Sequence, residues 1–123
     1  MRRYTESHEW VEKQGKTCRV GISRYAQQEL GEIVHIELPK VGAKVSAEQE
    51  AAILESTKAA SDVYSPLSGT ITAVNDRVKE DPRLLNTSPE EEGWLFSLEP
   101  TSEAEWETLL TEEGYHQMVG AHS

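Results

Sequence analysis

The chain has 123 residues, 37% of them hydrophobic and 28% charged, which is enough to bury a core in a single domain over residues 1–123. Its formal net charge of −10 repels nucleic acids and anionic membranes, so both are excluded as partners. No apolar run is long enough to span a bilayer, and Arg2 and Arg3 precede no apolar segment of the signal-peptide type. A cytoplasmic protein, or the mature form of a mitochondrial-matrix protein, is therefore expected.

Cysteine and histidine, two residue types that often carry catalysis or bind metals, are few in this chain. The single cysteine, Cys18, has no partner for a disulfide within the chain and is expected to be a packed small hydrophobe. The four histidines show no ligand spacing, so no metal site is predicted. Neither a glycine-rich phosphate loop nor a nucleophile elbow occurs. The sequence therefore favours a binding or carrier role over an enzyme with an active site of its own.

The first forty residues predict a hairpin, a short helix and a strand. Residues 8–13 and 17–22 read as two strands joined by a turn at Gln14-Gly15. Ser23 can cap a short helix, and Gly31 is placed to end it. The β-branched content of residues 32–39 then favours a strand, which Pro39 terminates.

The middle of the chain carries the densest strand signals. Strands are predicted at 51–56, around 62–64 and at 70–75, with a turn at 66–69. Gly69 is expected to supply either a positive φ or a close backbone approach. Short strands at this spacing indicate an all-β sandwich or a flattened barrel.

The last third predicts broken helices, one strand and a terminal helix. Pro82 and Pro89 forbid one long helix, and a final strand is expected within residues 93–100. Ser102 and Glu105 have the spacing of a capping box. They precede a helix whose apolar stripe would pack on the sandwich and which Gly114 would end. That stripe is formed by Trp106, Leu109 and Leu110.

Lys58 lies at the centre of "ESTKAASDVYSP", residues 55–66, where the neighbouring side chains are small. The flanking strands would hold this lysine on a rigid turn, and the small neighbours would leave its amine open to a modifying enzyme. Acylation would also remove its positive charge. An unmodified lysine at a hairpin tip has the same local pattern, so local features alone leave both readings open.

This stretch and four others together resemble the glycine cleavage system H-protein family. Their order and spacing fit over roughly residues 4–118, with 119–123 as a flexible tail. Biotinyl carriers set their lysine between methionines, and lipoyl domains of acyltransferases carry Asp before it, whereas Thr57 and Ala59 flank Lys58 here. The other four stretches are "SHEWVE" at 7–12, "VGISRYAQQELGEIVHIELPKVG" at 20–42, "PRLLN" at 82–86 and "EGWLF" at 92–96.

The resemblance implies a mainly β fold, a flattened β-barrel sandwich hybrid of the lipoyl/biotinyl type with short helices including one at the C-terminus. It implies lipoic acid in amide linkage on Lys58, attached by a lipoyl ligase or octanoyltransferase. The carrier would take an aminomethyl group from the pyridoxal-phosphate glycine decarboxylase (P protein) to the tetrahydrofolate-dependent aminomethyltransferase (T protein). Dihydrolipoamide dehydrogenase (L protein) would then reoxidise the dithiol. The chain itself would be a non-catalytic carrier.

The resemblance also implies a cleft into which the loaded arm folds, with Ser7, Glu9 and Asp62 at the positions that hold its amine. Carboxylates beside an amine favour its ammonium form, which has no lone pair to expel the sulfur as thiolate. Solvated acidic residues are the alternative interpretation of Glu9 and Asp62.

The stretch "PEEEGW" at 89–94 departs from the family pattern, because Glu90 replaces an aromatic residue. That departure motivates a second hypothesis, a relay protein that passes octanoyl or lipoyl groups to other enzymes' domains. A third is an unmodified interaction module that keeps only the scaffold.

Overall fold

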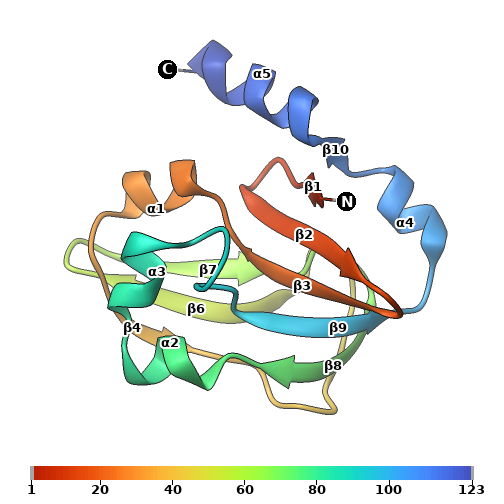
Figure 1. The fold of residues 1–123 in the computed structure, drawn as a ribbon, viewed down its shortest axis with the longest axis horizontal. Coiled ribbons are helices and arrows are strands. Elements are labelled where there is room, and N and C mark those ends of the chain that lie inside the picture. Colours follow the sequence, from red (N-terminus) through yellow and green to blue (C-terminus); the bar gives the residue numbers. More distant parts are fainter. Residues whose placement is uncertain (1, 123) are drawn as a thin grey trace.

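Short strands and shorter helices alternate along the chain. The computed structural model describes residues 2–122 (Figure 1). Its elements are β1 (Arg2–Tyr4), β2 (Glu9–Gln14), β3 (Thr17–Ile22), α1 (Arg24–Leu30), β4 (Ile33–Glu37), β5 (Lys44–Val45), β6 (Glu50–Ser56), β7 (Ala60–Tyr64), β8 (Gly69–Val74), α2 (Asp76–Glu80), α3 (Arg83–Thr87), β9 (Phe96–Pro100), α4 (Glu103–Glu107), β10 (Leu110–Thr111) and α5 (Glu112–His122).

The strands form two antiparallel sheets. Seven strands are ordered β10-β1-β2-β3-β9-β8-β5, and three are ordered β4-β6-β7. The three-stranded sheet lies behind β3 and β9, and α1, α2 and α3 gather at the end where β4 begins (Figure 1). The mainly β architecture with short helices, predicted from the sequence, is confirmed.

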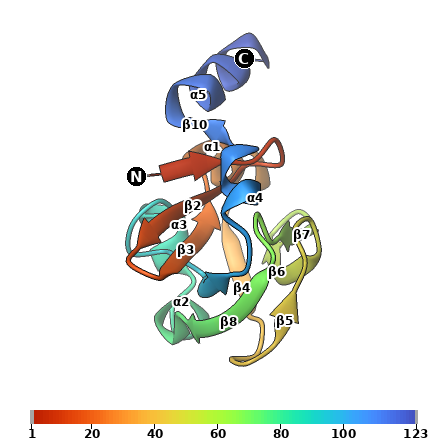
Figure 2. The same ribbon diagram turned by 90° about the vertical axis from the view of Figure 1, so that its right-hand side faces the viewer.

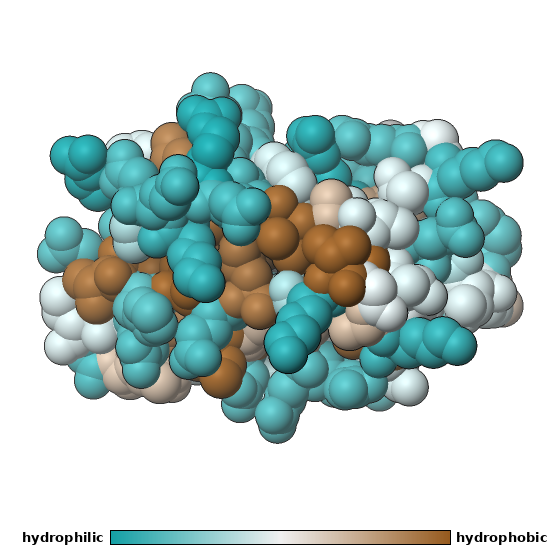
Figure 3. All heavy atoms as spheres, turned by 90° about the horizontal axis from the view of Figure 1, so that it is seen from below, coloured by the Kyte–Doolittle hydropathy of each residue, from teal (hydrophilic) through white to brown (hydrophobic). Residues whose placement is uncertain are grey.

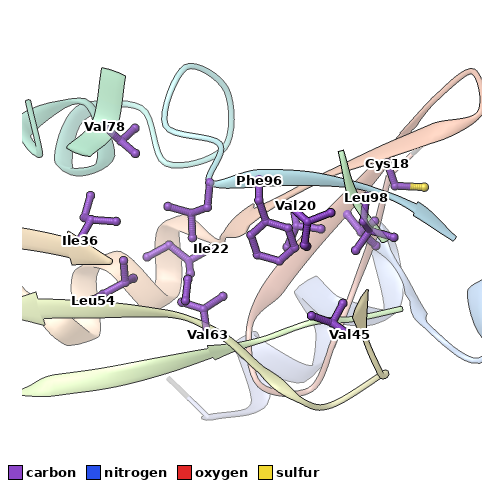
Figure 4. Packing of buried hydrophobic residues seen from close by; sticks show 14 of the residues in the cluster. Cys18, Val20, Ile22, Ile36, Val45, Leu54, Val63, Val78, Phe96 and Leu98 are labelled. Atoms are coloured by element: carbon purple, nitrogen blue, oxygen red, sulfur yellow. The ribbon is translucent and has the colours of Figure 1, made fainter. Parts of the chain in front are cut away.

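One apolar core fills the space between the two sheets. β3 and β9 supply buried side chains from one side, and β4, β6 and β7 supply them from the other. Cys18 is buried in this core, as expected of a packed small hydrophobe. Figure 4 labels ten of these core residues, among them Val20, Ile22, Phe96, Leu54 and Val63.

A second apolar cluster fastens the C-terminal helix to the first two strands. The rings of Tyr4 and Tyr115 stack with centroids 4.2 Å apart, and both pack with Trp10. Figure 2 shows α5 beyond β10, at the outer edge of the seven-stranded sheet. α5 continues to His122, so most of the predicted flexible tail is helical. Residue 123 lies outside the described residues.

The lower face of the molecule is not uniformly polar despite the net charge of −10. Apolar side chains form a band among polar ones on this face (Figure 3). Within residues 2–122, no helix has the length and apolar composition needed to cross a membrane.

The predictions for the first forty residues are confirmed. β2 and β3 pair in register from Glu9↔Ile22 to Gln14↔Thr17 around a turn in which Gly15 has a φ of 67°. The Ser23 side chain accepts a hydrogen bond from the Ala26 N–H at the start of α1. Gly31 ends that helix with a φ of 86°.

The predicted capping box is wrong. The Ser102 side chain makes no capping hydrogen bond. The Glu105 carboxylate instead accepts from the Ser68 N–H and hydroxyl, both at 2.7 Å. The Glu105 carboxylate therefore bonds two donors in the turn before β8 and does not cap the start of α4.

The predicted terminal helix is also divided differently. α4 ends at Glu107, so Leu109 lies beyond it and Leu110 belongs to β10. Gly114 lies in the first turn of α5 and ends no helix. β1 and β10 were not predicted, because three and two residues are too short for a periodic pattern.

Gly69 is required by a close backbone approach and not by its own dihedral angles. A Cβ at this position would lie 2.2 Å from the carbonyl oxygen of Glu99 on β9. Gly69 also pairs with Pro100 at one end of the β8–β9 ladder. A side chain here would force the two strands apart.

We expect Gly69→Ala to lower the free energy of unfolding by about 1–3 kcal/mol, the usual cost of forcing extra atoms into a packed site. Urea unfolding monitored by circular dichroism would measure the loss. Gly120→Ala is the control, because a Cβ there meets nothing within 4 Å. Equal stability of the two variants would contradict the close-approach explanation.

Candidate functional site

Lys58 lies in the tight turn between β6 and β7, as predicted. Thr57, Lys58 and Ala59 are exposed. The Ser56 hydroxyl accepts from the Lys58 and Ala59 N–H groups, both at 3.1 Å. The Ser56 N–H donates to the Ala59 carbonyl at 2.8 Å. One serine therefore satisfies the turn internally and holds its backbone in place.

The turn also rests against the C-terminal end of α1. The Thr57 N–H donates to the Glu32 carbonyl at 3.1 Å. The Lys58 Nζ donates to the Glu29 carbonyl at 3.5 Å, and a Cβ on Gly31 would lie 3.1 Å from Lys58 Cε. The glycine that ends α1 thus leaves room for the lysine stem, a contact that the local sequence pattern around Lys58 does not reveal.

Glu9 is a buried carboxylate at the start of β2, with an exposed fraction of 2%. It accepts from the hydroxyls of Thr5 at 2.6 Å and Ser7 at 2.5 Å. Its second oxygen accepts from the Tyr64 N–H at 3.3 Å. Burial raises the pKa of Glu9 above its ordinary value, and the bonds from Ser7 and Thr5 oppose that rise.

In the part of the chain that the structure describes, the hydrogen bonds to the Glu9 carboxylate come from neutral donors. No lysine or arginine among residues 2–122 forms an ion pair with it. A carboxylate that accepts only from neutral donors satisfies its oxygens but keeps an uncompensated charge. A cation that entered this site would offset the burial cost.

The structure brings Ser7 and Glu9 together in one cleft of about 550 Å³, which Tyr64 and Glu105 also line. Asp62 lies on β7 two residues before Tyr64, is exposed, and lines a separate depression with Glu37 and Ile53. Two of the three predicted amine contacts therefore share a cavity, and the third lies on the neighbouring sheet surface.

Sequence reasoning missed two contributors to the Glu9 site. Thr5 donates to the Glu9 carboxylate and accepts from the Glu9 N–H at 3.1 Å, so it closes the loop before β2. Tyr64 contributes only its backbone N–H. The hydroxyl-rich stretch before Glu9 was an available signal for Thr5, whereas a backbone donor leaves no signal in sequence.

Glu90 of the "PEEEGW" stretch is engaged within the chain. Its carboxylate accepts from the Tyr4 hydroxyl at 2.9 Å, the Arg24 N–H at 2.7 Å and the Arg2 guanidinium at 3.4 Å. It therefore joins the 88–94 loop to β1 and to the first residue of α1. Among residues 2–122, no group of three or more acidic, histidine or cysteine side chains could hold a metal ion.

We expect Glu9→Gln to remove a pH-dependent cost of folding. A carboxyl group with a raised folded pKa stabilises the fold fully below its unfolded value, near 4.5, and this stability is lost as pH rises through the folded pKa. Glutamine lacks this loss, so stability relative to the wild type should shift in favour of the variant as the pH rises over the range above about 4.5. Urea unfolding across that range measures the shift.

Glu6→Gln, which alters an exposed carboxyl group beside the same cleft, should show a smaller shift. A stability difference between Glu9→Gln and the wild type that does not change with pH would contradict the buried-carboxylate explanation.

Comparison with known proteins places this chain and its fold in a family. Residues 2–122 match the Glycine cleavage H-protein family. The chain is 47% identical to the glycine cleavage system H protein of Thermotoga maritima, over 95% of this chain and 94% of that protein. It is 46% identical to a probable glycine cleavage system H protein of Haloarcula marismortui, over 95% and 92% of the two chains.

A solved structure supports the same relationship. The crystal structure of a glycine cleavage system H protein from Mycobacterium marinum superposes with a TM-score of 0.86 at 38% identity. The match covers 97% of this chain and 96% of that one. The flattened β-barrel sandwich expected from the resemblance is thereby confirmed, and the chain belongs to the glycine cleavage H-protein family.

Proposed function

We propose that this chain is the lipoyl carrier of a glycine cleavage system, with lipoic acid in amide linkage on Lys58. The observation that carries the proposal is an exposed lysine on a braced turn, in a chain that matches the H-protein family over residues 2–122. The carrier would serve the glycine decarboxylase, the aminomethyltransferase and dihydrolipoamide dehydrogenase in turn. It would be their shared substrate and would catalyse no step itself.

The residues around Lys58 fit an acyl attachment. The amine makes one long hydrogen bond, to the Glu29 carbonyl, and its neighbours on the turn are small. A modifying enzyme could therefore reach Nζ without displacing a packed side chain. When bound, the lipoyl group supplies a disulfide that accepts a one-carbon unit with two electrons. The turn supplies fixed presentation to several active sites.

The cleft around Glu9 would hold the amine end of the carried group. Glu9 forms no ion pair with a lysine or arginine within residues 2–122, and Ser7 fixes its carboxylate with a bond of 2.5 Å. The negative charge of this carboxylate would stabilise a nearby ammonium group. The ammonium would in turn offset the free-energy cost of burying Glu9. Asp62 would add a weaker attraction, since it is exposed and its field is screened by solvent.

The relay hypothesis keeps the modified lysine but removes the chain from glycine turnover. This hypothesis was based on the "PEEEGW" stretch. Glu90 of that stretch accepts hydrogen bonds from Tyr4 and Arg24, which give it a structural role inside the fold. We therefore favour the glycine cleavage carrier. Lipoyl donation to another enzyme's domain, without glycine–bicarbonate exchange, would favour the relay.

We expect lipoyl ligase to add one lipoyl group to the wild-type chain and none to Lys58→Arg, because arginine offers no acylable amine. Intact-mass measurement detects the increment. Lys44→Arg, which changes another exposed lysine, is the matched control and should be modified like the wild type. A lipoyl increment on Lys58→Arg would overturn the assignment of this residue.

We expect Glu9→Ala to increase the rate at which the aminomethyl-loaded carrier loses its amine. Loss of one neighbouring carboxylate lowers an amine pKa by about one unit, which corresponds to about tenfold faster loss. Ammonia released from the decarboxylase-loaded protein, without tetrahydrofolate, measures this rate. Asp62→Asn should have a smaller effect, and Glu6→Gln, at the exposed rim of the same cleft, should have little. Equal rates in all four proteins would contradict the role of Glu9.

A further inference from the structure

Asn86, in α3, forms a pair of hydrogen bonds with one residue of β4. Its side-chain oxygen accepts from the Ile33 N–H at 2.8 Å, and its side-chain nitrogen donates to the Ile33 carbonyl at 3.1 Å. A primary amide presents one acceptor and one donor side by side, as a neighbouring β-strand residue does. Asn86 therefore acts as a one-residue strand partner on the outer edge of β4.

The backbone just before Ile33 points toward the lysine turn. In an antiparallel ladder, successive residues direct their N–H and C=O groups to opposite sides. Ile33 directs both groups to Asn86, and the Glu32 carbonyl points the other way, where it accepts from the Thr57 N–H at 3.1 Å. Ile33 is also paired with Ser56, whose hydroxyl holds the turn.

The register of β4 against β6 needs support at this end. The pairing is irregular between Ile33 and His35, so the ladder is interrupted one residue after Ile33. β4 is an edge strand, so within residues 2–122 no further strand pairs with its outer edge. Asn86 supplies the hydrogen bonds that such a strand would give to the Ile33 N–H and carbonyl. Without them, the Ile33 N–H and carbonyl would depend on water, and the end of β4 would be free to shift.

Asn86 is itself held from α1. Gln27, which is largely buried, directs its side-chain amide toward the Asn86 side-chain oxygen at 3.5 Å. The Arg24 guanidinium donates to the backbone carbonyls of Asn86 at 2.9 Å and Thr87 at 2.7 Å. The amide is therefore oriented before it meets β4.

We propose that Asn86 is a positioning residue for modification of Lys58, acting through Ile33 and Glu32 to fix the turn that presents the amine. The role in modification rests on the proposed function of Lys58. The mechanical part does not, because the hydrogen bonds that link Asn86 to Ile33 and Glu32 to Thr57 are formed with Lys58 unmodified. Asn86 does not bond the Lys58 amine, whose hydrogen bond goes to the Glu29 carbonyl.

The test compares Asn86→Ala with Asn75→Ala. Asn75 is a matched control, because its buried amide donates to two backbone carbonyls, those of Glu92 at 2.9 Å and Trp94 at 2.8 Å. Neither of these acceptors bonds the lysine turn. Both variants lose two backbone hydrogen bonds, so a purely structural role predicts similar behaviour at Thr57.

Amide hydrogen exchange of the whole unmodified protein is the first readout. We expect the Thr57 amide to exchange about tenfold faster in Asn86→Ala than in Asn75→Ala, as the loss of hydrogen bonds supporting its acceptor would produce. The amide of Ile71, in β8 of the other sheet, donates to the Ala43 carbonyl. Its exchange rate should not differ between the two variants. Asn86→Asp keeps an acceptor for the Ile33 N–H but loses the donor, so it should change Thr57 in the same direction even if Asn86→Ala folds poorly.

The second readout is the initial rate of lipoylation by the ligase, divided by the rate at which acetic anhydride acetylates Lys58. We expect this ratio to fall about threefold or more in Asn86→Ala, since an enzyme requires the presented conformation and a small reagent does not. The proposal would be overturned if the Thr57 amide exchanged at the same rate in Asn86→Ala as in Asn75→Ala. Absence of lipoylation in the wild type would instead overturn the proposed function and leave the exchange comparison decisive for Asn86.

Discussion

The antiparallel pairing of β4 with β6 is the constraint on which the presentation of Lys58 depends. β6 leads directly into the lysine turn, and β4 begins two residues after the glycine that ends α1. The pairing therefore brings the end of a helix and the tip of a hairpin together, where the Thr57 N–H meets the Glu32 carbonyl. A turn held by backbone bonds on two sides needs no bulky side chains, which explains how Lys58 can be rigidly placed and openly exposed at once.

The two parts of the site use opposite electrostatic arrangements. Lys58 is a cation in solvent, where its charge costs little and can be removed by acylation. Glu9 is an anion in a buried position, where its charge is costly and is moderated by two hydroxyls and one backbone N–H. β7 connects them, because it begins two residues after Lys58 and ends at Tyr64, the residue that donates to Glu9. One strand thus links the turn proposed for lipoyl attachment to a buried carboxylate that could accept a cation.

Features set by near neighbours in the chain could be predicted from sequence. The hairpin at Gly15, the Ser23 cap and the Lys58 turn each depend on a few consecutive residues, and the structure confirms them. Features set by competition between distant groups could not. Glu105 had two possible donors, and only the fold reveals that Ser68 lies closer than the start of α4. The separate location of Asp62 is likewise a consequence of strand placement. The number of residues between Lys58 and Asp62 does not predict the distance from Asp62 to Glu9.

The departure at Glu90 shows how a change in a loop can be absorbed without altering the site. A carboxylate among residues 89–94 needs donors, and the fold supplies the Tyr4 hydroxyl, the Arg2 guanidinium and the free N–H at the start of α1. A negative charge at a helix N-terminus is also favourable. The same helix carries Arg24 and Gln27, which orient Asn86, and it ends at the glycine beside Lys58. The loop and the lysine turn therefore contact opposite ends of α1, and Glu90 has a structural role within the fold.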